Sequence, residues 1–152
     1  MKQLYRIIAL LLLLFIAVTS GCDPKGDLSE AETQKLFDEI QPLVTSGELW
    51  TYKMSREGGS WSSEEQKNSD FELIKAAAED AFDPANHFET DGIWWSSKSY
   101  CRICRIFIDK AFTYNGAERT VTYIEAIKNR NGSIRLDVTF ADADRVGIRF
   151  TP

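Results

Sequence analysis

The chain has 152 residues, of which 43% are hydrophobic and 27% are charged, a balance typical of one globular domain. Four Trp, five Tyr and nine Phe exclude a chain that is disordered throughout. A formal net charge of −5 disfavours nucleic acid as a partner, because nucleic-acid binding usually needs a basic surface. The single histidine excludes a metal site built from several histidines, and we predict neither a metal nor another cofactor.

The first 22 residues follow the order of a secretory signal peptide. Lys2 and Arg6 make the start basic, residues 7–18 are an unbroken apolar run, and small residues lead to Cys22. The apolar run is too short for a comfortable membrane span, which needs ~20 residues.

Residues 18–22, Val-Thr-Ser-Gly-Cys, resemble the lipobox of bacterial lipoproteins, with Thr19 where leucine is most often found. The resemblance covers residues 1–22 only. It implies that Cys22 is acylated and becomes the first residue of the mature protein. Acyl chains stabilise attachment by ~0.8 kcal/mol for each buried CH₂ group. The alternatives are an ordinary signal peptide with a chance cysteine and an uncleaved anchor.

The lipobox divides the chain into a signal peptide at 1–21, a tether at 22–28 and one domain at 29–152. The mature protein is expected to be lipid-anchored in the bacterial cell envelope and to face the periplasm. Asp23 resembles the inner-membrane retention signal of enteric bacteria, a rule that other bacteria do not follow, so the sequence does not decide which membrane holds the anchor.

The first half of the domain predicts two amphipathic helices separated by a strand and a loop. Ser29 and Glu32 have capping-box spacing, and apolar residues recur at helical spacing over 36–44. Pro42 should kink or restart this helix, because it lacks a backbone donor. The expected elements after the first helix are a strand at 49–54, a loop at 55–69 and a second helix at 70–82.

From Ile93 onward the pattern predicts β-structure. Asn115-Gly116 and Asn131-Gly132 are hairpin signals, because both residue types tolerate a positive φ. The expected fold class is α+β, with the two N-terminal helices packed on one face of a curved antiparallel sheet that ends in a four-strand meander. The order of elements resembles cystatin-like and NTF2-like topologies, in topology only.

Short turns at these signals and at 142–144 give an expected strand register. In that register Tyr123 and Glu125 share the apolar face of the sheet. The opposite face carries Asp137 and Arg149 as direct cross-strand neighbours. A carboxylate among apolar side chains is a feature of functional sites, so Glu125 and Tyr123 are candidate binding residues. The alternative is that the sheet end is open and Glu125 reaches water.

Cys101 and Cys104 form a C-x-x-C pair within a predicted strand. An oxidising compartment favours a disulfide between them. Strand geometry opposes it, since residues three apart in a strand lie ~10 Å apart and a disulfide needs Cα atoms within ~7 Å. The sequence leaves this bridge open.

Trp94 and Trp95 are adjacent, so in a strand they point to opposite faces and one of them can lie outside the core. Together with Trp61 they would form an aromatic binding patch, or they would cap the rim of a small core.

The expected function is that of a membrane-anchored envelope lipoprotein with a small non-catalytic binding domain. Its partner would be a protein or a small ligand, and an immunity-type protein that blocks a toxin belongs to this class. The alternative is an NTF2-like enzyme that uses an acidic residue in a pocket between helix and sheet. No catalytic residue is assigned.

Overall fold

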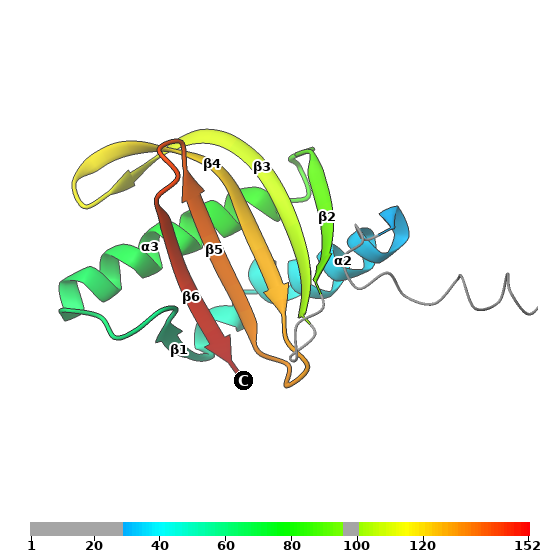
Figure 1. The fold of residues 1–152 in the computed structure, drawn as a ribbon, viewed down its shortest axis with the longest axis horizontal. Coiled ribbons are helices and arrows are strands. Elements are labelled where there is room, and N and C mark those ends of the chain that lie inside the picture. Colours follow the sequence, from blue (N-terminus) through cyan, green and yellow to red (C-terminus); the bar gives the residue numbers. More distant parts are fainter. Residues whose placement is uncertain (1–28, 96–100) are drawn as a thin grey trace, which may run out of the picture.

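A computed structural model describes residues 29–95 and 101–152, with only the backbone described at 93–95 and at Cys101. Within these residues the chain forms two α-helices, a 3₁₀ helix and a six-stranded sheet (Figure 1), so the predicted α+β class is confirmed. The elements are α2 (Glu30–Thr45), η1 (Glu48–Thr51), β1 (Lys53–Arg56), α3 (Glu64–Ala81), β2 (Thr90–Trp95), β3 (Cys101–Tyr114), β4 (Ala117–Lys128), β5 (Ile134–Phe140) and β6 (Arg145–Thr151).

Serine side chains fix the start of both helices. The Ser29 hydroxyl accepts a hydrogen bond from Glu32 N–H at 3.3 Å, and the Glu32 carboxylate accepts one from Ser29 N–H at 3.1 Å, which is the predicted capping box. The Ser63 hydroxyl accepts a hydrogen bond from Gln66 N–H at 3.1 Å and caps α3, which begins before the expected residue 70. The helix α2 continues through Pro42 to Thr45, so of the two outcomes expected there, a kink or a restart, the restart does not occur.

Residues 48–51 form a 3₁₀ helix, and the strand expected at 49–54 is confined to Lys53–Arg56. Gly47 has a φ of 80°, which lets the chain leave α2 and turn directly into η1. Trp50 packs edge-on against Phe71 and Phe150, with ring centroids 5.9 and 5.6 Å away. Core packing therefore overrides the strand preference of this segment.

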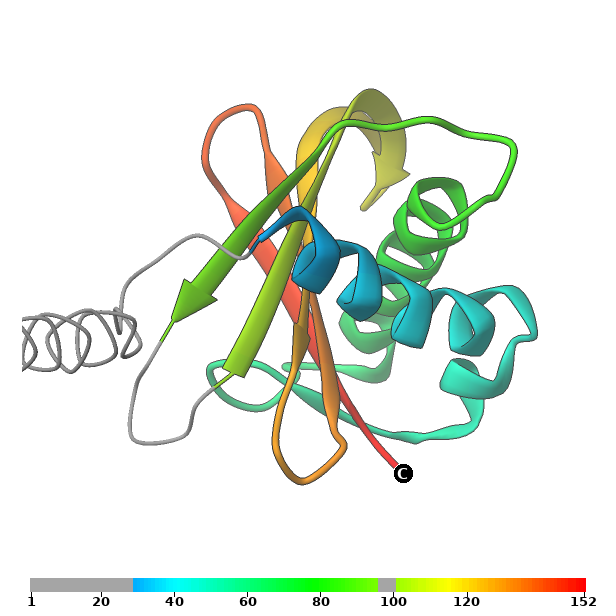
Figure 2. The same ribbon diagram turned by 90° about the vertical axis from the view of Figure 1, so that its right-hand side faces the viewer.

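The sheet is antiparallel throughout, and its strands lie in the order β1-β6-β5-β4-β3-β2. Figure 2 shows α2 and α3 on the same side of the sheet. We call the other side the outer face, and no helix of the described residues lies over it. None of the described helices is long and apolar enough to cross a membrane. The core joins buried side chains of the helices to those of the inner sheet face, among them Leu36, Ile40, Leu73, Ile74, Phe82, Ile106, Ile124, Leu136, Val138, Phe140, Ile148 and Phe150.

Two irregularities in the sheet set a register that differs from the expected one. Tyr114 pairs with Ala117 as the two-residue turn predicts, but the β3–β4 ladder shifts between Phe107 and Lys110. The β4–β5 ladder shifts between Val121 and Tyr123, at the same level of the sheet. Such bulges bend a strand and offset its pairing by one residue.

A one-residue offset exchanges the two faces of a strand, and this overturns the predicted position of Glu125. Glu125 and Tyr123 lie opposite Arg105 and Phe107 on the outer face, so the prediction that they face the core is wrong. Between β5 and β6 the observed register differs from the expected one by two residues, so each side chain stays on its expected face. Asp137 therefore lies opposite Gly147, and the predicted direct pairing of Asp137 with Arg149 is also wrong.

Candidate functional site

The bent meander brings charged and apolar side chains from four strands into rows on the outer face. Each row crosses β3, β4, β5 and β6 in that order, because directly paired residues lie side by side. The three rows are Ile103–Ile127–Arg135–Arg149, Arg105–Glu125–Asp137–Gly147, and Phe107–Tyr123–Thr139–Arg145.

Five charged side chains in these rows form a continuous chain of ion pairs, which we call the arginine ladder: Arg105, Glu125, Arg145, Asp137 and Arg135. Glu125 Oε1 lies 2.9 Å from Arg145 Nη2 and 3.6 Å from Arg105 Nη2. Asp137 Oδ2 lies 3.5 Å from Arg145 Nη2. Asp137 also accepts a hydrogen bond from Arg135 Nε at 2.8 Å and a second one from Arg135 Nη2.

The ladder continues to the loop after β1. Glu57 lies 3.3 Å from Arg135 Nη1 and 3.2 Å from Arg149 Nη2. Glu57 N–H also donates to the Gly147 carbonyl at 3.1 Å, which holds this loop against β6. The ladder is thus tied at one end to the edge of the sheet.

Both carboxylates of the ladder are withdrawn from water. The side chain of Asp137 is 2% exposed and that of Glu125 is 9% exposed. A buried charge is costly unless it is paired, and each of these carboxylates has two guanidinium neighbours. Burial lowers the pKa of Arg135, but the hydrogen bond and charge of Asp137 outweigh it and raise that pKa overall. The charge of Asp137 therefore favours the protonated, paired form of Arg135.

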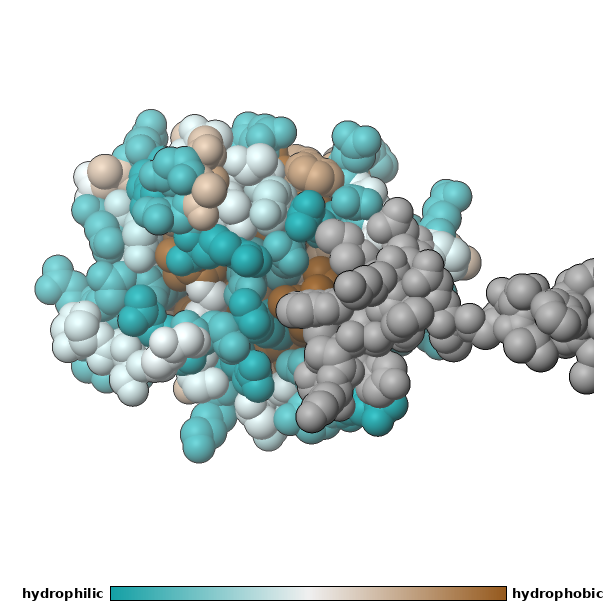
Figure 3. Space-filling model, in the orientation of Figure 1, coloured by the Kyte–Doolittle hydropathy of each residue, from teal (hydrophilic) through white to brown (hydrophobic). Residues whose placement is uncertain are grey.

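A hollow of about 270 Å³ lies over the ladder. Figure 3 shows polar groups spread across this side of the molecule, with apolar patches between them. Arg105 stacks on the Tyr123 ring with its Cζ 4.3 Å from the ring centroid, and its buried Nε has no hydrogen-bond partner. We call the hollow the arginine hollow, and it is lined by Ile103, Arg105, Glu125, Ile127, Arg135, Asp137 and Arg145.

Comparisons with protein-family models, with curated proteins and with solved structures find no match. What the outer face can bind therefore follows from its own geometry and charge. No three His, Cys, Asp or Glu side chains in residues 29–95 and 101–152 are placed to hold a metal ion together.

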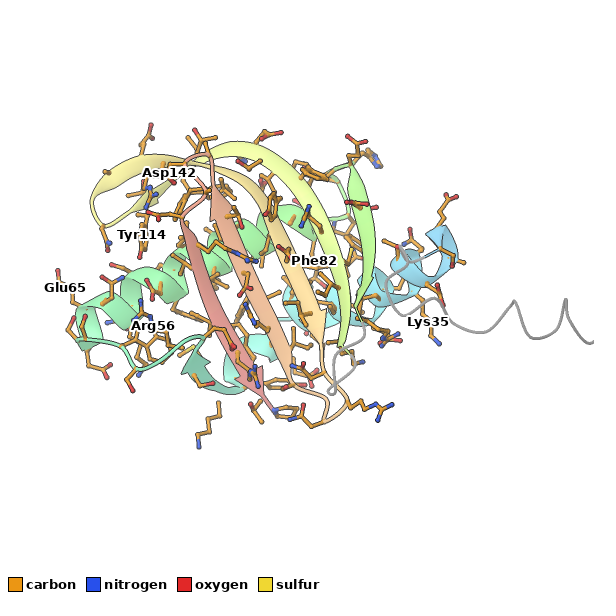
Figure 4. The ribbon with its side chains drawn as sticks, viewed as in Figure 1. Lys35, Arg56, Glu65, Phe82, Tyr114 and Asp142 are labelled. Carbon is orange, nitrogen blue, oxygen red and sulfur yellow. The ribbon has the colours of Figure 1, made fainter. Side chains whose placement is uncertain are left out.

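Trp61 has a structural partner. Its Nε1 donates to Asp70 at 2.9 Å, and Asp70 also accepts bonds from Tyr114 Oη at 2.8 Å and from Gln66 Nε2 at 2.6 Å. Arg56 Nε lies 3.9 Å from the same carboxylate. Figure 4 shows Tyr114 and Arg56 over the N-terminal half of α3. This cluster around the buried Asp70 carboxylate ties the β3–β4 hairpin to α3.

Trp94 and Trp95 lie in β2, where their backbones pair with Arg102 and Cys101. Tyr114, which shares Asp70 with Trp61, lies at the other end of β3. The structure therefore does not bring Trp61 together with the Trp94–Trp95 pair. The side chains of that pair lie outside the described residues, as does Cys22, so a binding role for Trp94 or Trp95 stays a prediction.

Cys104 is a free, fully buried cysteine, so the proposed bridge to Cys101 is not formed in this structure. Both residues belong to the uninterrupted start of β3, where strand geometry keeps residues three apart too distant for a bridge. Burial, with a smaller effect of the charge of Asp91, raises the pKa of the Cys104 thiol to about 12. A thiol with that pKa is a poor nucleophile.

The sequence pattern did not mark Arg145 or Gly147 as residues of a binding site. Its one indication was Gly147 itself, because a glycine in the middle of an otherwise regular strand often marks a place where another group approaches the backbone closely. The structure identifies that group as the Asp137 carboxylate.

Proposed function

We propose that this protein is a lipid-anchored bacterial envelope lipoprotein whose domain binds a partner through the outer face of its sheet. The lipobox-like segment that ends in Cys22 supports the anchor. The arginine hollow is the observation that carries the binding role. Arginine and tyrosine are among the residue types that most often dominate binding energy, and here three arginines line the hollow beside Ile103 and Ile127, with Tyr123 stacked on Arg105.

The arginine ladder suits binding because its guanidinium groups are already held in place. A free arginine loses side-chain freedom when a partner immobilises it, at a cost of ~0.5–1.5 kcal/mol. Arg105 is fixed by Tyr123 and Glu125, and Arg145 is fixed by both carboxylates. The partner is a protein or a small ligand, and a toxin that this protein neutralises would fit the first class.

The enzyme alternative depended on an acid in a pocket between helix and sheet. Glu125 lies on the outer face and is paired with two arginines, so that pocket lacks its proposed acid. The likeness of the element order to cystatin-like and NTF2-like topologies remains a prediction, and it carries no function here.

The anchor is tested by comparing the wild-type protein with Cys22→Ser. We expect the wild type in the membrane fraction with a mass that includes acyl chains, and the variant at precursor mass without acyl chains. Recovery of a mature wild-type protein without acyl chains in the soluble periplasm would show that the anchor is wrong.

The binding face is tested by photo-crosslinking in intact cells. A photoreactive residue at exposed Ser55, beside Arg149 on the outer face, should capture a partner. The matched control is the same residue at exposed Glu79 on α3, on the helix side of the molecule. Equal capture from both positions, or capture from Glu79 alone, contradicts the proposed face.

A further inference from the structure

We propose that the arginine hollow binds a carboxylate group that carries a short apolar stem. This inference rests on the proposed function, since it names the chemistry that the outer face recognises. The carboxylate can come from a free organic acid or from a protein, as an acidic side chain or a C-terminus.

The first argument is the charge of the hollow. Three guanidinium groups and two carboxylates line it, and Glu57 and Arg149, which pair with each other beside it, add one charge of each sign, so the whole cluster carries one net positive charge. A single carboxylate neutralises that charge. Inorganic phosphate carries more negative charge at neutral pH, and the nearby carboxylates of Glu125 and Asp137 would repel the excess. The hollow therefore favours a monoanion.

The second argument is the supply of unused donors. Arg105 Nη2 lies 3.6 Å from Glu125, beyond hydrogen-bond distance, and its Nε is buried without a partner. A quarter of the Arg105 side chain remains exposed, so a ligand meets Arg105 through that part of the guanidinium group and not through the buried Nε. Arg145 is half exposed, and the contacts of its Nη2 with Glu125 and Asp137 leave its Nη1 and Nε as donors for the ligand. Arginine is also suited to bidentate binding of a planar carboxylate.

The third argument is the apolar wall. Ile103 and Ile127 pair across β3 and β4 and line one side of the hollow, next to Arg135. A ligand that places its carboxylate on Arg105 lies beside these two side chains. A stem of a few CH₂ groups would bind more tightly with each group that is removed from water. The site thus selects for an aliphatic acid over a bare anion.

The test is a titration of the full chain, purified in a neutral detergent, with hexanoate as the probe. The neutral isostere hexanamide and inorganic phosphate are the comparison ligands. We expect saturable binding of hexanoate that is at least tenfold tighter than that of either comparison ligand, with NMR shifts at the arginine side chains of the hollow. Equal binding of hexanoate and hexanamide overturns the proposal.

Two variants localise the binding. Arg105→Gln should weaken hexanoate binding at least tenfold, because it removes the positive charge and the guanidinium donors. Arg149→Gln is the matched control, since Arg149 belongs to the same face but does not line the hollow. If Arg105→Gln does not fold, Arg105→Lys replaces it, because lysine keeps the positive charge but lacks the planar guanidinium group that binds a carboxylate with two hydrogen bonds. Equal effects at positions 105 and 149 overturn the proposal.

Two peptides distinguish a protein-borne carboxylate from a free organic acid. One has a free C-terminal leucine, and the other is the same peptide amidated at its C-terminus. Binding of the free peptide more tightly than hexanoate, with loss on amidation, identifies a protein-borne carboxylate, and equal binding of hexanoate identifies a free acid. Both results support the hollow. If no carboxylate ligand binds but the photoreactive residue at position 55 still captures a partner, only this inference is overturned. If that residue captures no partner, the proposed function is contradicted.

Discussion

Gly147 lies directly opposite Asp137, and the Asp137 carboxylate occupies the space that a side chain at position 147 would need. A Cβ atom there would stand 3.1 Å from Asp137 Cγ and closer than 3.0 Å to Oδ1. Glycine therefore has a steric reason at this position. Without the clash, alanine would be favoured in a strand by roughly 0.5–1 kcal/mol.

We expect Gly147→Ala to lower the free energy of unfolding by about 1–3 kcal/mol, the usual cost of overpacking. Denaturant unfolding measures this directly. In an Asp137→Ala background the same substitution should cost less, because the clashing carboxylate is gone and only Glu57 Cβ, at 3.3 Å, remains close. An equal loss in both backgrounds would show that Asp137 is not the reason for the glycine.

Glu39 makes a pH-dependent contribution to stability. The hydrogen bonds from Arg102 and then Lys128 lower the pKa of Glu39 from 4.5 to about 2. A lowered pKa means that this stabilisation is present above pH 4.5 and is lost as the pH falls from 4.5 to about 2. Glu39→Gln should therefore be less stable than the wild type at pH 7, and the difference should shrink over that window. Glu72→Gln, at an exposed position of α3, is the control for the loss of one carboxylate.

Tyr114 should give the opposite dependence at alkaline pH. Burial, and then the hydrogen bond and charge of Asp70, raise the pKa of Tyr114 above its usual value of 10.0. The wild type should lose stability above pH 10, because the unfolded state gives up this proton more readily. Tyr114→Phe should cost about 1–3 kcal/mol at pH 7, because it removes the hydrogen bond that Tyr114 donates to Asp70 and the one that it accepts from Gln66, and it should show a smaller alkaline loss. Tyr52→Phe is the control, and an alkaline loss that is identical in wild type and Tyr114→Phe contradicts the assignment.

Local signals in the sequence predicted the local structure well. The capping box at Ser29 and the two-residue turn at Asn115-Gly116 depend on neighbouring residues only, and both are confirmed. Apolar residues alternate with polar ones in β5 and β6 and face the helices, so those strands also lie where they were expected, although Asp137 and Thr139 of β5 are buried as well. The 3₁₀ helix at 48–51 was missed because its conformation is set by tertiary packing of Leu49 and Trp50.

The candidate site was not predictable to the same extent, because it depends on register. The bulges near Asp109 and Thr122 each add one residue, and no side-chain pattern marks an added residue. The expected register of β4 differs from the observed one by one residue, which placed Glu125 on the wrong face. The expected β5–β6 register differs by two residues, which leaves every side chain on its expected face. The charges of the arginine ladder can be read from the sequence, but which arginines contact Glu125 depends on the strand register and could not be predicted.

The bulge in β3 provides the last prediction. Asp109 has a φ of 47°, a left-handed conformation that aspartate and glycine tolerate and β-branched residues do not. Asp109→Gly should leave the melting temperature unchanged or raise it, and Asp109→Val should lower the free energy of unfolding by about 1–2 kcal/mol. Glu118→Val, at an exposed position of the same hairpin, is the control and should cause no loss, because valine favours strands. NMR contacts between the rings of Phe107 and Tyr123, whose centroids lie 5.8 Å apart, report the register itself. A Phe107 that contacts Ile124 across the strands instead of Tyr123 would restore the register without a bulge, return Glu125 to the inner face and remove the arginine hollow.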